Sequence, residues 1–378
     1  MKRKIVALIF LPFILLLYLI SPVLLIRIGG IRADRLGHLA LDLELCLCSE
    51  ANDTNLLPRR INLFYVIPPI SNDYLLKLWK TKILIFPRYF LSLLDISIKS
   101  FRFFQKHNFF NLVDLHGHTD LSILDNSIPT LSFTSDEVKQ GQNLLQQLGI
   151  PADQQFVCLA VRDDRYLNEF LPGKNWSYHD FRDSNIQDYL QMAEYLTQKG
   201  FFVIRMGKLV QKELKTSNTM IIDYANSLLR SDFADVYLFA NCTFCISTST
   251  GMDALASIFR KPIGLVNVVN IGSVASGNII KLFQPKSFFD TRLKRELNFK
   301  EIGAKNLFHF SESSKLLESG IVLKDNSPEE LSLFAGDLLQ IISEDQLRPS
   351  IESESNFISE RLNKISHAWL SRHLGYFN

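Results

Sequence analysis

The stretch that decides the fold is CISTSTGMDALASIF, residues Cys245–Phe259. A short apolar run ends in four consecutive hydroxyl residues, Ser247–Thr250, and passes through Gly251 into a helix-like segment. This order predicts a buried strand, a tight turn and a helix. Hydroxyls and backbone amides at such a turn, ahead of a helix N-terminus, form an anion site that suits a diphosphate. The alternative is that Ser249 or Thr250 only caps the helix.

Short apolar segments alternate with helical segments on both sides of this turn. We expect strands at 155–161, 201–207, 220–222, 244–247 and 262–268, and helices at 186–199, 232–240 and 251–259. Such alternation favours a doubly wound parallel α/β sheet, and we assign residues 151–350 to one Rossmann-like domain. Because ligands of open α/β sheets bind at the carboxyl ends of the strands, the turn lies where a ligand is expected.

The first strand of this domain is followed by charged residues. The sequence FVCLAVRDDRYL, Phe156–Leu167, places Arg162 just past the apolar run. An arginine there can bind two phosphate oxygens through its planar fork of N–H groups. The alternative is a surface cluster whose charges pair with one another.

A second Rossmann-like domain is expected over residues 23–150. VLLIRIGG, Val23–Gly30, predicts a buried strand that runs into a glycine turn, and an amphipathic helix follows at 34–48. After it we expect a strand at 61–67, a short helix from Asn72 or Asp73 and a candidate strand at 82–86. A helical stretch at 89–110 and a capping-box helix from Thr134 or Ser135 to Gly149 complete the domain. The last segment, 351–378, is expected to form a helix that packs back on the first domain.

The chain begins with a candidate membrane segment, residues 1–22. Three basic residues, Lys2–Lys4, precede an apolar run that contains Pro12 and leaves only about 16 to 18 residues for a membrane. Positive charge lies on both sides of this run, so the positive-inside bias gives no direction. We therefore favour a re-entrant or in-plane helix over a single span, with the domains in the cytoplasm at the inner membrane. No small-residue cleavage site follows, so we expect no cleavage.

Composition excludes several classes of function. The net charge is only +2 and arginine-rich blocks are absent, which argues against a nucleic-acid partner. The five cysteines are odd in number and lie in apolar surroundings, so we interpret them as reduced core thiols. Cys242 and Cys245 form a C-x-x-C without a second pair at zinc-ligand spacing, so we expect no metal. A G-x-G-x-x-G motif is absent after every strand, which disfavours a nicotinamide cofactor, and we expect no cofactor.

Candidate general bases lie in the first half of the chain. His38 falls one turn inside the helix at 34–48, and its alternative is a histidine packed by its neighbours. The sequence LHGHTDLS, Leu115–Ser122, adds His118 and Asp120. A histidine beside a carboxylate fits general-base work on a hydroxyl, whereas the alternative is a polar loop without a catalytic role.

A long loop, Leu171–Asn185, follows the strand that ends before Arg162. Its length beyond a normal crossover predicts a functional lid. The lid residues that could contact a ligand are Trp176, Tyr178, His179 and Arg182.

Several of these segments, taken in order along the chain, resemble those of known protein families. The order FVCLAVRDD, NWSYHDFRDSNI, FFVIRMG and the segment Ile221–Asn267 resembles a family of bacterial glycosyltransferases found with surface-polysaccharide genes, over residues Arg27–Glu330. Residues 155–262 resemble, more distantly, the donor domain of alpha-1,6-fucosyltransferases and protein O-fucosyltransferases. The resemblance implies a GT-B-like α/β fold of two Rossmann-like domains facing a cleft, and a metal-independent glycosyltransferase. Its expected partners are a nucleotide-diphosphate sugar and a glycan acceptor, lipid-linked or at the membrane surface.

The resemblance also implies roles for residues. Arg162 takes the place of the donor-phosphate arginine, and Ser247, Thr248, Ser249, Thr250 and Gly251 take that of the phosphate-side loop. Asp223 and Tyr224 fall where nucleotide contacts are made. The opening motif IRIGGIRADRLGHL, Ile26–Leu39, places Gly30, Arg32 and Arg35 on the acceptor side, with Asp34 and His38 as acceptor or catalytic residues.

One position departs from the fucosyltransferase pattern, because Ala160 stands where that motif has a histidine. This departure supports the alternative of a non-catalytic nucleotide-sugar or glycan-binding subunit of a polysaccharide-assembly complex. Retaining and inverting chemistry both stay open.

Overall fold

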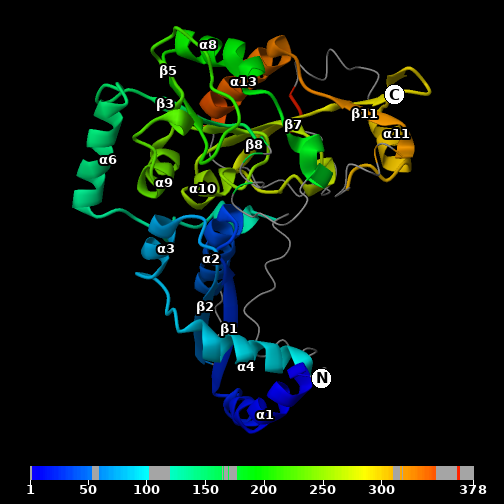
Figure 1. Cartoon of the computed structure of the whole chain (residues 1–378). Coiled ribbons are helices and arrows are strands. Elements are labelled where there is room, and N and C mark those ends of the chain that lie inside the picture. The colour runs from blue at the N-terminus through cyan, green and yellow to red at the C-terminus, as the bar shows by residue number, and fades with distance from the viewer. Residues whose placement is uncertain are drawn as a thin grey trace. The chain divides into compact units, whose positions relative to one another are not determined.

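The computed structural model describes residues 2–52, 59–101, 120–163, 165, 169, 177–309, 316, 318–345 and 364–366, with the backbone alone at 2–5 and 177–179. The chain divides into two compact units (Figure 1). The first unit holds the described residues up to 101 together with Asn126–Ser132, and the second holds 120–125 and the described residues from Phe133 onward.

The second unit is built on a six-stranded parallel sheet. Its strands are β3 (Phe156–Ala160), β4 (Phe202–Met206), β5 (Ile221–Ile222), β6 (Cys245–Ser247), β7 (Ile263–Val268) and β8 (Ile280–Pro285), in the order β5-β4-β3-β6-β7-β8. The chain runs outward from β3 to β5, then returns to β6 beside β3 and continues to β8. The predicted doubly wound parallel sheet is therefore confirmed. Its order reverses between β3 and β6, which makes their shared edge the topological switch point.

Helices cover both faces of this sheet. α8 (Leu190–Gln198) and α13 (Pro328–Asp345) lie on one face, whereas α9 (Asp232–Asn241) and α10 (Asp253–Ile258) lie on the other (Figure 1). Every residue of β3 and β4 is buried, as expected for strands covered on both sides. Gly264 lets α13 approach closely, because a Cβ atom there would lie 2.6 Å from Leu338.

Smaller elements complete the second unit. A three-stranded antiparallel sheet has the order β10-β9-β11, from β9 (Ser287–Asp290), β10 (Arg295–Glu296) and β11 (Ile321–Lys324), and α11 (Phe299–Ala304) lies between β10 and β11 in the sequence. Short 3₁₀ helices are η1 (Ser122–Leu124), η2 (Ser177–Arg182), η3 (Ile186–Tyr189), η4 (Tyr224–Asn226) and η5 (Ile271–Ser273). Residues 364–366 pair beside β8 in this unit, and the rest of the predicted helix at 351–378 lies outside the described residues.

The second unit also contains α6 (Ser135–Gln147), which the sequence analysis assigned to the first domain. Its capping box is present, with Thr134 and Glu137 bonded to each other's backbone. The helix packs on α9 because Gly141 leaves room for the ring of Tyr237, where a Cβ atom would lie 2.0 Å from that ring. The second unit thus begins before the predicted boundary at 149–151.

The first unit is a smaller α/β assembly. It contains α1 (Lys2–Ile20), β1 (Leu24–Arg32), α2 (Leu36–Ala51), β2 (Arg59–Ile67), α3 (Asp73–Trp79) and α4 (Arg88–Ser100). β1 and β2 pair in parallel, which is one β-α-β step of the predicted Rossmann-like domain. The expected strand at 82–86 is seen as a single bridge between Phe64 and Ile85. Residues 102–110 of the expected helix at 89–110 lie outside the described residues.

The expected glycine turn after the first strand is wrong. β1 continues through Gly29 and Gly30 to Arg32, in register with β2. A Cβ atom at Gly30 would lie 2.9 Å from the ring of Tyr65 and 2.8 Å from Ile67. Glycine is therefore needed at Gly30 for a close side-chain approach within the sheet, and not for a turn.

The N-terminal helix packs on the first unit with one of its faces. Ile14 and Leu17 of α1 are buried in a cluster with Leu91 and Leu94 of α4. In the part of the chain that the structure describes, none of the helices combines the length and the apolar character needed to span a bilayer.

Candidate functional site

The candidate site is centred on the adjoining ends of β3 and β6. Ala160 pairs with Ser247, and the backbone N–H of Thr248 donates to the carbonyl of Ala160 at 3.1 Å. The next backbone N–H, of Arg162, donates to Thr248 Oγ1 at 2.9 Å. The structure therefore brings Arg162 and the Ser247–Thr250 turn together, as the sequence analysis expected, at the switch point where ligands of such sheets bind.

The hydroxyl turn has a distinctive backbone. Ser249 has φ of 59°, a left-handed conformation that is uncommon for a residue other than glycine and concentrates at functional turns. Ser247 Oγ accepts from the N–H of Thr250 at 3.3 Å, and Thr250 Oγ1 accepts from the N–H of Met252 at 3.1 Å. α10 begins at Asp253, two residues later than predicted, and has six residues. A helix this short offers no N-terminal anion site of its own, so the candidate site consists of the turn and its neighbours.

A carboxylate that sequence reasoning missed supports this turn. Ser247 Oγ donates to Asp253 Oδ2 at 2.9 Å. Loss of solvation raises the pKa of Asp253 from 3.8 to about 6, against the lowering effects of the Ser247 bond and the charge of Arg182. Asp253 is the one acidic residue in the stretch Cys245–Phe259, which is the signal that could have found it.

Two arginines flank the turn. Arg182 donates from Nη2 to the carbonyl oxygen of Ser249, and Arg162 Nε lies 3.1 Å from Asp183 Oδ1. The N–H of Ser184 donates to the carbonyl of Arg162 at 3.1 Å. The segment 182–184 thus bonds to both strand ends: Arg182 contacts the hydroxyl turn, and Asp183 pairs with Arg162.

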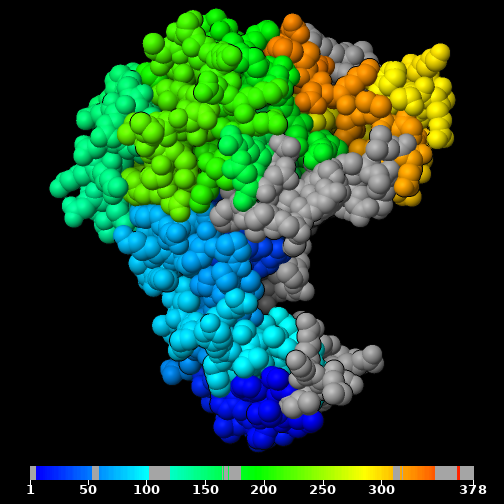
Figure 2. All heavy atoms as spheres, viewed as in Figure 1, coloured from blue at the N-terminus to red at the C-terminus, as the bar shows by residue number. Residues whose placement is uncertain are grey.

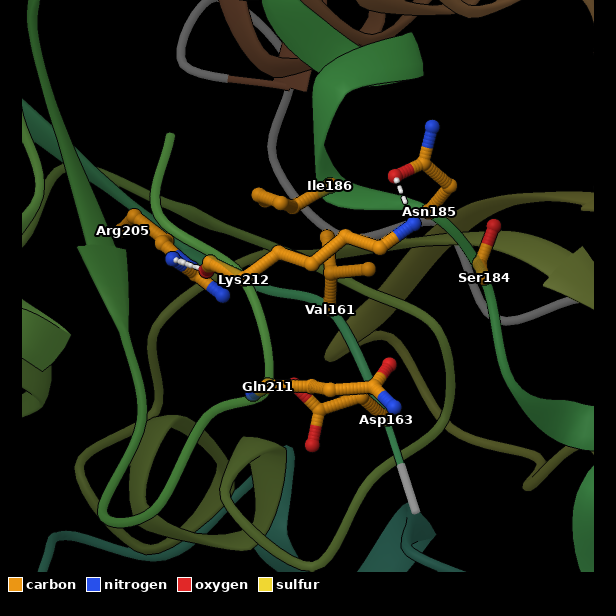
Figure 3. A pocket seen from close by; sticks show the side chains of 8 residues that line it. All are labelled: Val161, Asp163, Ser184, Asn185, Ile186, Arg205, Gln211 and Lys212. Carbon is orange, nitrogen blue, oxygen red and sulfur yellow. Dashed lines mark hydrogen bonds between the residues drawn. The ribbon is translucent and has the colours of Figure 1, made fainter. Parts of the chain in front are cut away.

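A polar pocket opens beside Arg162, at the ends of β3 and β4 (Figure 3). It is lined by Val161, Asp163, Ser184, Asn185, Ile186, Arg205, Gln211 and Lys212. The aliphatic part of Lys212 crosses it toward Asn185, and the carboxylate of Asp163 accepts from the N–H of Gln211 at 2.9 Å. Sequence reasoning missed Asn185, Gln211 and Lys212, although Gln211 and Lys212 follow a predicted strand and Asn185 ends the predicted lid.

The prediction that Tyr224 contacts the nucleotide is wrong. Its side chain is fully buried, and its hydroxyl donates to Asp235 at 2.9 Å. Burial and the charge of Asp235 raise the pKa of Tyr224 well above its usual value. The residue is therefore part of the core beneath the site, where the hydroxyl satisfies a buried carboxylate.

Asp223 also has a structural role. Its carboxylate accepts from the buried Arg205 at 3.1 Å, from the N–H of Leu214 at 2.9 Å and from Asn226 at 2.7 Å. With these partners, Asp223 shapes the loop after β4 that carries Gln211 and Lys212. It supports the wall of the pocket without lining it.

The first unit contains a histidine held between two charged residues. His38 Nδ1 lies 3.2 Å from both oxygens of Asp42, and His38 Nε2 lies 3.2 Å from Arg32 Nη1. Arginine can only donate and an ionised aspartate can only accept, so we infer that the proton is on Nδ1 and the lone pair on Nε2. An imidazole oriented by a carboxylate is the arrangement of a general base. Asp42 was not among the residues predicted from the sequence, although its i, i+4 spacing from His38 on a helix could have indicated this contact.

Other acceptor-side candidates lie near this histidine. Asp34 Oδ1 is 3.7 Å from Arg32 Nε, so Arg32 contacts both candidate bases. Arg35 occupies the N-cap position of α2 with an extended backbone. Gly30 lies within β1, as described above.

Asp120 belongs to the second unit and accepts hydrogen bonds from the N–H of Ser122 at 3.0 Å and from Ser276 Oγ at 2.9 Å. These bonds lower the pKa of Asp120, whose carboxylate acts here as a local hydrogen-bond acceptor. His118 and Trp176 lie outside the described residues, as do the side chains of Tyr178 and His179.

The cysteines behave as core residues. All five are buried and free, as expected of core thiols. Burial raises the pKa of the Cys158 and Cys245 thiols well above the usual value, which disfavours the thiolate that binds metals. Within the described ranges, His, Cys, Asp and Glu residues form no cluster that could hold a metal ion.

Comparison with known proteins gives matches in solved structures alone. Neither a family model nor a curated protein matches the sequence. A glycosyl transferase family 9 protein of Veillonella parvula is 11% identical, with 65% of this chain and 80% of that chain covered and a TM-score of 0.38. The ADP-heptose LPS heptosyltransferase II of E. coli is 11% identical, with coverages of 85% and 99% and a TM-score of 0.41.

A third similar structure is the iron-containing dodecameric glycosyltransferase TibC of enterotoxigenic E. coli, at 14% identity, coverages of 68% and 61% and a TM-score of 0.34. All three proteins are glycosyltransferases by description. At such values the likeness transfers neither a reaction nor a ligand to this chain.

Proposed function

We propose that this chain is a GT-B-type glycosyltransferase that moves a sugar from a nucleotide-diphosphate sugar to a hydroxyl of a glycan, in surface-polysaccharide assembly. The observation that carries the proposal is the switch-point site, where Arg162, Arg182 and the Ser247–Thr250 turn meet at the ends of β3 and β6.

The diphosphate is assigned to the turn because of charge and hydrogen-bonding capacity. Two guanidinium groups can supply paired N–H donors to phosphate oxygens, and the turn adds hydroxyls and backbone amides. Asp253 would oppose an anion if it were ionised, but its raised pKa lets it take up a proton near pH 6. In this proposal the arginine charges stabilise the leaving diphosphate in place of a bound cation.

The nucleoside is assigned to the polar pocket of Figure 3. Val161, Asp163 and Ser184 line the pocket; the first two are the chain neighbours of Arg162, and the N–H of Ser184 donates to the Arg162 carbonyl, so the pocket adjoins the proposed diphosphate site. Asn185, Gln211 and Lys212 provide amide and ammonium groups suited to ribose hydroxyls and base edges. These residues are the proposed determinants of which nucleotide binds.

The acceptor hydroxyl is assigned to His38. The Nδ1–H of this histidine points to Asp42, which leaves Nε2 as the atom that takes the proton from the acceptor. Arg32 now contacts Nε2 and orients the ring before an acceptor arrives. We propose Asp42 as the positioning residue for this base.

We also propose that α1 attaches the protein to the inner membrane from the cytoplasmic side. A lipid-linked or membrane-surface glycan would then meet the enzyme at the bilayer. The apolar sequence of α1 and its basic start, Lys2–Lys4, support this placement.

A second candidate function is a non-catalytic nucleotide-sugar or glycan-binding subunit of a polysaccharide-assembly complex. The observation that favours it is Ala160, fully buried in β3 at the position of the histidine in the fucosyltransferase motif. Both candidate functions predict nucleotide-sugar binding, but only the glycosyltransferase predicts turnover.

The test begins with thermal shifts of the full chain against a panel of nucleotide sugars, because a ligand of the folded state raises its stability. The binding sugar is then followed for nucleoside diphosphate release with glycan acceptors. We expect binding and turnover from the wild type, and binding without turnover from His38→Asn. If the wild type binds and never turns over, the second candidate is correct, and if none of the nucleotide sugars binds, both fail.

A further inference from the structure

The helices α1 and α4 form one layer on the first unit and bury only their inner faces. Ile14 and Leu17 on α1 and Leu91 and Leu94 on α4 are buried in the shared cluster. The two helices also touch through the rings of Phe10 and Phe90, whose centroids are 5.6 Å apart. The pair is therefore a single structural element with a second, outer face.

The outer face of this pair is apolar. We define the α1–α4 face by its exposed residues Leu8, Ile9, Phe13, Leu15, Leu16 and Leu19 on α1, and Tyr89, Phe90, Leu93 and Ile96 on α4. Ile9 is 70% exposed, Leu19 73% and Tyr89 88%. Figure 2 shows atoms of both helices, in dark blue and cyan, on the surface of the first unit.

A surface helix ordinarily carries polar residues opposite its core stripe, and α4 departs from this rule because its outer face also carries apolar residues. Tyr89, Leu93 and Ile96 recur at helical spacing on the outer face, whereas the acid of the helix, Asp95, lies inside. Apolar surface of this kind marks an interaction site.

Charge indicates what covers the face. The sequence of α1 contains no acidic residue and begins with Lys2–Lys4. On α4, Arg88 and Lys99 are exposed, and Asp95 is buried where it accepts from Tyr65 at 2.8 Å and from Lys99 at 2.9 Å. The exposed charges of α4 are thus both positive and the sequence of α1 carries only basic charges, which complements an anionic surface and opposes a symmetric contact between two copies of the chain.

We infer that the α1–α4 face docks on an anionic phospholipid bilayer, with α1 lying in the membrane plane and the outer residues of α4 entering the lipid beside it. This inference deepens the proposed membrane attachment and rests on it, because it gives α4 an equal part in an interfacial contact. Basic residues bind the headgroups while the apolar side chains reach the acyl boundary. The contact is independent of the donor site in the second unit.

The test is flotation of the full chain with vesicles of phosphatidylglycerol and phosphatidylcholine, or of phosphatidylcholine alone. The variant Tyr89→Ser/Leu93→Ser/Ile96→Ser removes exposed apolar side chains that lie outside the shared cluster, so folding is preserved. We expect it to lower the partition coefficient at least about tenfold, because each lost side chain contributes buried apolar area. Leu228→Ser, a fully exposed leucine of the second unit, is the matched control and should bind as the wild type does.

A second part of the test changes the charge of the α1–α4 face and the salt concentration. Arg88→Glu should weaken binding to phosphatidylglycerol vesicles, and added salt should reduce the difference between the two vesicle types. Nucleotide-sugar binding by these variants should equal that of the wild type, which separates failure of this inference from failure of the proposed function.

Two results would overturn the inference. One is a triple variant that floats as well as the wild type, since α4 would then have no part in the contact. The other is a wild type that ignores vesicles and forms a dimer which the triple variant loses, since a second copy would then cover the face.

Discussion

Replacing Asp253 by asparagine tests the electrostatics of the switch-point turn. The carboxyl accepts from Ser247 Oγ at 2.9 Å, and an asparagine oxygen can accept the same bond. The substitution therefore preserves the geometry of the turn while it removes a titrating group whose pKa is raised from 3.8 to about 6.

The sign of the stability effect follows from the direction of this shift. An acid whose pKa is higher in the folded state destabilises the fold as pH rises from about 4 to 6. Above that range the loss of stability is complete. Between pH 5 and pH 7.5 the penalty from Asp253 grows by about 1.4 kcal/mol, which is one pKa unit of difference. The free energy of unfolding of Asp253→Asn, taken relative to that of the wild type, should therefore rise by about 1.4 kcal/mol between these two pH values.

The same group links nucleotide binding to pH. A diphosphate near Asp253 favours the protonated carboxyl, which is about three quarters populated at pH 5.5 and about 3% at pH 7.5. The Kd of the wild type for its nucleotide sugar should rise by up to about 25-fold over this interval, and that of Asp253→Asn should stay flat.

The assays are urea denaturation and calorimetric titration at several pH values, with Asp153→Asn as control because Asp153 is an exposed aspartate of the second unit. A stability difference between Asp253→Asn and the wild type that does not change with pH would refute the reasoning. An equal pH dependence of Kd in both proteins would show that the diphosphate binds elsewhere.

Three further predictions concern other parts of the molecule. Asp42→Asn should lower kcat at least about tenfold with little change in the Kd of the nucleotide sugar. The reason is that the carboxylate no longer fixes the orientation of the His38 ring or the position of its proton. A kcat equal to that of the wild type would exclude Asp42 as a positioning residue. Tyr224→Phe should cost about 1 to 3 kcal/mol in urea denaturation, since it removes a hydrogen bond to the buried Asp235, and an unchanged midpoint would contradict the assigned core role. Gly30→Ala should destabilise the first unit by about 1 to 3 kcal/mol, because its methyl group would overlap the Tyr65 ring, and a variant as stable as the wild type would show that the strands separate freely.

The sheet of the second unit could be predicted from sequence because its strands are short, apolar and separated by helices at regular spacing. Parallel strands of this kind place their carboxyl ends on one edge, so the sequence alone predicts that Arg162 and the hydroxyl turn lie near each other. The structure adds the contact itself, from the Arg162 N–H to Thr248. It also adds the environment of Asp253: the sequence shows a lone acid after the hydroxyl turn, but not that loss of solvation raises its pKa.

Other assignments depended on tertiary contacts that a pattern cannot show. A tyrosine after a strand can point to a ligand or to the core, and Tyr224 points to the core because Asp235 needs a buried partner. Two adjacent glycines suggest a turn, yet Gly30 serves the packing of Tyr65 within a longer strand. The outward apolar residues of α4 became evident only when the inner face of the helix was known.

The central claim is that the switch-point site binds a nucleotide-diphosphate sugar through Arg162. The most direct measurement is calorimetric titration of the wild type and Arg162→Ala with the nucleotide sugar that the thermal-shift panel selects, with the exposed Arg292→Ala as control. Loss of a charged hydrogen bond to phosphate predicts a Kd at least about tenfold higher for Arg162→Ala and an unchanged Kd for the control. An Arg162→Ala protein that is folded and binds as tightly as the wild type would contradict the claim.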